Sequence, residues 1–251
     1  MKMMACVVTF LLFVGLCKAD VITIAADEWM PFTGNEKEQN GYMIEIAKTV
    51  FEKQGHTIVF KNVPWSRAVT EAEKGNYTAI AGAYVSDAPT FIFPTEEQGL
   101  GIDVMYVLKS SGWSFSSYES LSSVTLGVIQ DYSYGDEMDA YIEKNEKTGK
   151  VNKITGSDNL THRLIQMLQQ NRITAFIENR NVCNYTMKLN KITDIKEAGT
   201  CKISNKIYIA FSPKNTKSNV YAKLLSDGMV ELRKSGELKK ILDKYGLKDW
   251  K

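Results

Sequence analysis

The sequence predicts an α/β protein of two lobes, each built on a parallel, doubly wound sheet. Three observations lead to this prediction. Short β-rich runs alternate with amphipathic helices after Asp20, the alternation restarts near residue 124, and two helices follow the last strand. Alternating strands and helices favour parallel sheets with right-handed crossovers.

The first series covers residues 21–81. We expect strands at 21–25, 57–61 and 78–81, and helices at 42–54 and 65–74. Gly55 and Gly75 stand where helices end, and Pro64 stands where a first turn tolerates proline. The order βαβαβ therefore describes one half of the molecule.

The second series covers residues 124–189. We expect strands at 124–129, 151–155 and 173–177. We expect helices at 160–170 and 181–189, and one that starts within 133–136 and runs to about 145. A late strand at 207–212 and helices at 217–234 and 237–244 end the chain. Segments 101–109 and 207–212 would pass between the lobes. Lobe 1 would then contain residues 20–108 and 207–251, and lobe 2 residues 109–206, with a hinged cleft between them.

The first 19 residues have the pattern of a cleaved export signal. Lys2 precedes an apolar run that ends at Cys17-Lys18-Ala19, a small-x-small site. A buried helix of the domain and lipidation at Cys17 are the alternatives. Without Lys2 and Lys18, the chain has 29 basic and 29 acidic residues. Such a neutral body has no broad field for nucleic acid, so we expect no nucleic-acid partner.

Two cysteines remain after this segment, Cys183 and Cys201. In an oxidising compartment they predict one disulfide, which by chain entropy would stabilise by about 3 kcal/mol. Two buried free thiols are the alternative. The histidines, His56 and His162, lie far from the cysteines in sequence, so we predict no metal site and no cofactor.

The residues after the predicted strands combine aromatic rings with a few charges, which is typical of a small-molecule site. In open α/β sheets ligands bind beyond the carboxyl ends of the strands. An arginine there can grip a carboxylate, and an acid can receive an ammonium group. The candidate ligand-binding residues are Asp27, Trp29, Trp65, Arg67, Gly82, Tyr84, Gln130, Tyr132, Ser133 and Glu178.

Several segments in a fixed order carry a family resemblance. They are residues 22–27 with Pro31-Phe32, residues 40–47, Gly82, Phe93-Pro94, residues 170–175 and residues 236–246. With these segments the chain resembles extracellular solute-binding proteins of the amino-acid-binding type, family three, which serve ABC importers. The resemblance implies a type II periplasmic-binding-protein fold that closes on a small polar ligand.

The resemblance also implies roles and partners. Trp65 would stack on the ligand, Gln130 to Ser133 would meet its anionic end, and Glu178 would hold an α-ammonium group. The expected protein is a periplasmic monomer without enzymatic activity, which hands its ligand to a membrane ABC permease or a sensor. A periplasmic dehydratase of the prephenate or arogenate type is the enzymatic alternative, with acid–base groups drawn from Asp27, Glu178 and His162.

One departure concerns the ligand. Family members that bind amino acids carry Thr-x-x-Arg after the third strand, and that arginine grips the α-carboxylate. Residues 84–93 contain no arginine. Arg67 is the candidate replacement, and a ligand other than an amino acid is the alternative.

Overall fold

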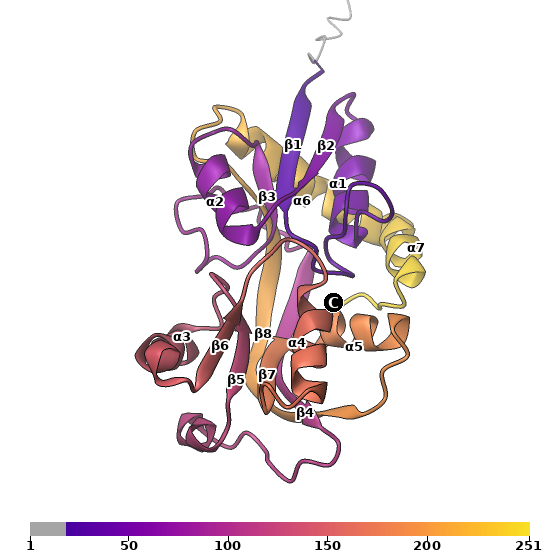
Figure 1. Ribbon diagram of the computed structural model, residues 1–251. Helices are drawn as coiled ribbons and strands as arrows, with labels where there is room; N and C mark the ends of the chain where they lie inside the picture. Colours follow the sequence, from indigo (N-terminus) through magenta and orange to yellow (C-terminus); the bar gives the residue numbers. More distant parts are fainter. Residues whose placement is uncertain (1–18) are drawn as a thin grey trace, which may run out of the picture.

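The computed structural model describes residues 19–251, with the backbone alone for residues 202–204. Except for Ala19, the predicted export signal lies outside these residues. The strands are β1 (Val21–Ala26), β2 (Thr57–Asn62), β3 (Ala79–Ala83), β4 (Gly99–Leu108), β5 (Leu126–Ile129), β6 (Val151–Ile154), β7 (Ala175–Asn179) and β8 (Ile195–Phe211). They form a sheet in the order β2-β1-β3-β8-β4-β7-β5-β6, which runs through both lobes (Figure 1).

Each end of the sheet is parallel, as the alternation of strands and helices predicts. β1 pairs in parallel with β2 and β3, and β5 pairs in parallel with β6 and β7. The middle is antiparallel, because β8 pairs with β3 and β4, and β4 also pairs with β7. The sheet is therefore mixed, and the expectation of purely parallel pairing holds only for its two ends.

β8 joins the two lobes. Residues 195–207 pair with β4, and residues 208–211 pair with β3. The predicted strand at 207–212 covers only the end of this 17-residue strand. With β4, β8 forms the two strands that cross between the lobes (Figure 1).

Seven α-helices of residues 19–251 cover the sheet: α1 (Tyr42–Glu52), α2 (Trp65–Glu73), α3 (Asp136–Asn145), α4 (Leu160–Gln169), α5 (Arg180–Leu189), α6 (Ser218–Ser235) and α7 (Glu237–Lys244). In the first lobe α1, α6 and α7 cover one face and α2 the other. In the second lobe α4 and α5 cover one face and α3 the other. Within the described chain no helix combines the length and apolar character that a membrane crossing requires.

The predicted disulfide between Cys183 and Cys201 is wrong, because both are free thiols. Cys183, on α5, packs in the cluster that contains Val104 of β4. Cys201, on β8, packs against the cluster that contains Met105. Successive residues of a strand face opposite sides of a sheet, so the two sulfur atoms lie on opposite faces. Burial raises the pKa of both thiols, that of Cys201 to about 12.

Candidate functional site

A small cavity lies between the lobes, where β1, β3 and β5 end. Its volume is about 30 Å³, room for a water molecule or two. The lobes therefore touch across the cleft in this conformation. The cavity is lined by Asp27, Trp29, Trp65, Ala81, Gly82, Tyr84, Asp87, Tyr132 and Ser133.

Seven of the ten candidate residues line this central cavity, and Glu178 lies beside it, bonded to Trp29. Arg67 and Gln130 are exposed and are not among its lining residues. Sequence reasoning missed Asp87, whose carboxylate accepts a 3.0 Å hydrogen bond from the Tyr84 backbone N–H. A signal was available, because Asp87 stands in the turn directly after β3.

Asp27 places a buried carboxyl group on the wall of the central cavity. It follows β1 and is only 3% exposed. The Tyr132 hydroxyl, from the second lobe, donates a 2.5 Å hydrogen bond to its Oδ2 atom. Burial raises the pKa of Asp27 to about 7, although the bond from Tyr132 acts in the opposite direction. Within residues 19–251, no lysine or arginine lines this cavity to compensate the charge.

Glu178, the residue before the last one of β7, is a buried carboxylate with three donors. The Trp29 indole N–H donates to its Oε1 atom over 3.1 Å, and the Asn179 backbone N–H donates to the same atom over 2.7 Å. The Thr161 hydroxyl donates to Oε2 over 2.6 Å. Burial still raises the pKa of Glu178. The bond from Trp29 joins the first lobe to the second.

Aromatic rings surround the central cavity, with Trp29 in the middle. Its ring stacks on Phe32 with centroids 4.5 Å apart. The rings of Tyr84 and Tyr132 are nearly perpendicular to it, with centroids 6.4 and 6.5 Å away. Gly82 has a φ of +94°, which favours glycine, and the indole packs directly over it.

The helical period explains why Arg67 lies outside. The buried face of α2 consists of Trp65, Ala68 and Ala72, spaced at three and four residues. Arg67 falls on the other side of the helix and is exposed. Trp65 lines the central cavity from the first turn of α2, whereas Arg67 faces solvent.

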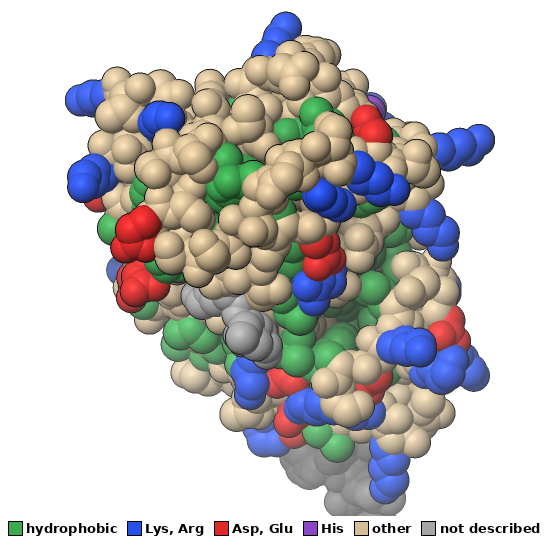
Figure 2. Space-filling model, turned by 90° about the horizontal axis from the view of Figure 1, so that it is seen from below, with side chains coloured by type: hydrophobic (Ala, Val, Ile, Leu, Met, Phe, Trp, Pro, Cys, Tyr) green, Lys and Arg blue, Asp and Glu red, His purple; other side chains and the backbone are tan. Residues whose placement is uncertain are grey.

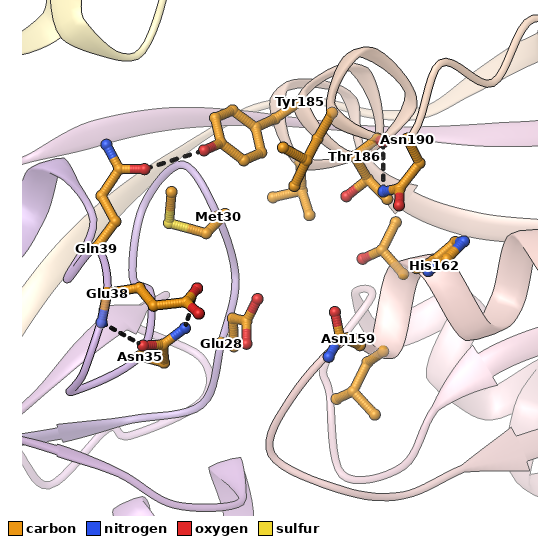
Figure 3. A pocket seen from close by; sticks show the side chains of 14 residues that line it. Glu28, Met30, Asn35, Glu38, Gln39, Asn159, His162, Tyr185, Thr186 and Asn190 are labelled. Carbon is orange, nitrogen blue, oxygen red and sulfur yellow. Dashed lines mark hydrogen bonds between the residues drawn. The ribbon is translucent and has the colours of Figure 1, made fainter.

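A second, larger cavity of about 220 Å³ also lies between the lobes. Figure 3 shows Glu28, Met30, Asn35, Glu38 and Gln39 on one side, and Asn159, His162, Tyr185, Thr186 and Asn190 on the other. We call it the side cavity.

Two hydrogen bonds close the lobes around the side cavity. The Tyr185 hydroxyl donates to Gln39 Oε1 over 3.1 Å, and the Glu28 backbone N–H donates to the Ser157 carbonyl over 2.7 Å. Burial raises the pKa of Glu28, and the nearby carboxylates of Asp158 and Glu38 raise it further.

One face of the molecule carries charges of both signs. Figure 2 shows Lys and Arg side chains spread around the face seen from below, with Asp and Glu side chains between them. Among residues 19–251, no group of three or more His, Cys, Asp and Glu side chains is arranged to hold a metal ion.

Comparison with known families gives one match that spans most of the chain. The model of the bacterial extracellular solute-binding proteins, family 3, matches residues 21–248. No curated protein sequence matches the chain.

Solved structures share the fold at low sequence identity. A substrate-binding protein of an ABC uptake transporter from Streptococcus pneumoniae, with bound histidine, is 20% identical over 91% of this chain and 93% of that one, with a TM-score of 0.73. A mutant of ArgBP from T. maritima is 17% identical over 90% of this chain and 95% of that chain, with a TM-score of 0.72. A histidine kinase sensor domain with similarity to periplasmic binding proteins is 15% identical over 91% of this chain and 96% of that chain, with a TM-score of 0.73.

Proposed function

Because the family model spans residues 21–248, the chain belongs to the bacterial extracellular solute-binding proteins of family 3, and we propose that it delivers a small polar ligand to an ABC transporter. The ligand is an amino acid or a related small organic molecule, captured between the lobes in the periplasm after export with a cleaved signal at residues 1–19.

The observation that carries this proposal is the central cavity, which is lined from both lobes. Asp27, Trp29 and Trp65 come from the first lobe, and Tyr132 and Ser133 come from the second. A ligand that contacts both sides shifts an open–closed equilibrium toward the closed form. The proposed lobes are residues 20–108 with 207–251, and residues 109–206. β4 lies at the boundary: its residues 104–107 fall in the first of these ranges, but their side chains pack in the cores of the second lobe.

In the proposed complex, the rings of Trp29 and Trp65 hold the ligand, and Gly82 and Tyr84 present the edge of β3. Tyr132 and Ser133 close on the ligand from the second lobe, and Glu178 orients the Trp29 indole through their hydrogen bond. These contacts require the lobes to part, because the closed cavity has room for a water molecule or two.

A thermal-shift screen of amino acids, small peptides, organic acids and polyamines tests capture. A ligand at 100 times its dissociation constant stabilises the folded state by about 2.7 kcal/mol. Trp65→Ala removes one wall of the cavity and should lower the affinity for a compound found in the screen. Val230→Ala, at an exposed position of α6, should leave that affinity unchanged. A screen without any stabilising compound would contradict the proposal.

Delivery needs its own test, because one structure with this fold is the sensor domain of a histidine kinase. Uptake of the identified ligand should fall when the protein is removed from cells. Unchanged uptake would favour a sensor as the partner.

The proposal includes no catalysis, and the dehydratase alternative is tested directly. Incubation with prephenate and arogenate should leave both compounds unchanged. Turnover of either one would replace the binding role by an enzymatic one.

A further inference from the structure

The charges around the two interlobe cavities carry information about the ligand. Asp27 lines the central cavity, and Glu28 and Glu38 line the side cavity. Within residues 19–251, neither lining includes a lysine or an arginine. From this arrangement we propose that the ligand is a small organic cation, an amine or a quaternary ammonium compound, without a carboxylate. This inference rests on the proposed function, because it concerns the ligand of the same cleft.

Asp27 is the counter-ion of this cation. Its carboxyl group is buried against aromatic rings, and it accepts a hydrogen bond from the neutral Tyr132 hydroxyl. A buried carboxylate without a cation nearby is unfavourable. A ligand ammonium group at this position would compensate the charge, so ligand binding and ionisation of Asp27 favour each other.

The aromatic frame suits the same ligand. Trp29, Trp65, Tyr84 and Tyr132 line the central cavity, and the faces of such rings attract cations. Tryptophan gives the strongest attraction of this kind. The cavity therefore offers a cation both a counter-charge and aromatic walls.

Two donors at the place expected for a ligand carboxylate are already bonded. The second-lobe loop before α3 was the expected place for an anionic group, but Ser133 Oγ donates to Asp139 Oδ2 over 2.9 Å. The Tyr134 backbone N–H donates to Asp139 Oδ1 over 2.8 Å. The first turn of α3 holds three acids, including Asp139, and these already complement the positive end of the helix. An anionic group placed here would be repelled.

Matched pairs of ligands test this inference by calorimetry. The pairs are agmatine with arginine, putrescine with ornithine, tyramine with tyrosine, and choline with glycine betaine. Each pair shares a nitrogen group and differs in the carboxylate. At least one amine should bind at least ten times more tightly than its carboxylate partner.

The outcomes separate this inference from the proposed function. If a carboxylate partner binds as tightly as its amine or more tightly, or if only organic acids bind, the ligand class is wrong and capture of a solute still stands. If no compound of the wider thermal-shift screen stabilises the protein, both proposals fail.

A variant pair tests the counter-ion. Asp27→Asn keeps the shape of the side chain and removes its charge, so the affinity for the best amine should fall at least tenfold. Asp243→Asn is the control, because Asp243 pairs with Lys239 on the exposed side of α7. Equal affinity of Asp27→Asn and the unchanged protein would overturn the role of Asp27.

Discussion

Replacing Asp27 by asparagine should stabilise the ligand-free protein at pH 8. The carboxyl group has its pKa raised from 3.8 to about 7 in the folded state, so the folded protein binds this proton more tightly than the unfolded chain. The stabilisation from protonation is complete below pH 3.8 and is lost as the pH rises through about 7. One pKa unit corresponds to about 1.4 kcal/mol, so the ionised group costs roughly 4 kcal/mol at pH 8.

Asparagine carries no such cost, and its carboxamide oxygen can still accept the hydrogen bond from Tyr132. The gain from Asp27→Asn should therefore be near zero at pH 3.5 and rise to roughly 4 kcal/mol at pH 8. If opening the lobes costs less free energy than burying the ionised Asp27, the protein opens at pH 8, and the gain from Asp27→Asn is limited to the cost of opening. Urea unfolding at several pH values measures it, with Asp243→Asn as the control. A gain that is the same at pH 3.5 and pH 8 would refute the reasoning.

Three further changes have defined outcomes. Gly101→Ala places a Cβ atom 2.6 Å from Asn179 Nδ2 and should lower the free energy of unfolding by about 1–3 kcal/mol. Gly112→Ala is the control, because no described heavy atom lies within 4 Å of its added Cβ, and it should leave the stability unchanged. Equal urea midpoints for the two variants would contradict this prediction. Tyr132→Phe removes a hydrogen bond that lowers the pKa of Asp27, so the pH at which stability is lost should rise. An unmoved midpoint would argue against that bond. A reductant should leave the melting temperature unchanged, since both thiols are free, and a drop would point to a disulfide.

The periodic elements could be predicted because their signals are local. The apolar spacing in α1 and α2 and the runs of β1 and β5 mark these elements without any knowledge of their partners. The start of β8 could not be found in this way. Residues 195–206 are largely polar and contain Gly199, so the strand exists through its pairing with β4. That pairing is a contact between distant segments, which local propensity does not report.

The site shows the same division between local and distant information. The positions of Asp27, Trp29 and Tyr132 after strand ends predicted that they line the cleft, because the topology alone brings the ends of these strands together. The outward direction of Arg67 also follows from the spacing of Trp65, Ala68 and Ala72. The bonding of Ser133 to Asp139 depends on the loop conformation before α3, and the sequence carries no simple signal for it.

The late position of β8, α6 and α7 in the chain has a consequence for folding order. In the first lobe, Ile22 and Ile24 pack in one core with Leu225 and Leu242, so this core joins segments about 200 residues apart in the sequence. Contacts between such distant segments slow folding, because a long loop must close before they form. The proposed second lobe is one continuous segment. During synthesis it can therefore become compact while the first lobe still waits for the end of the chain.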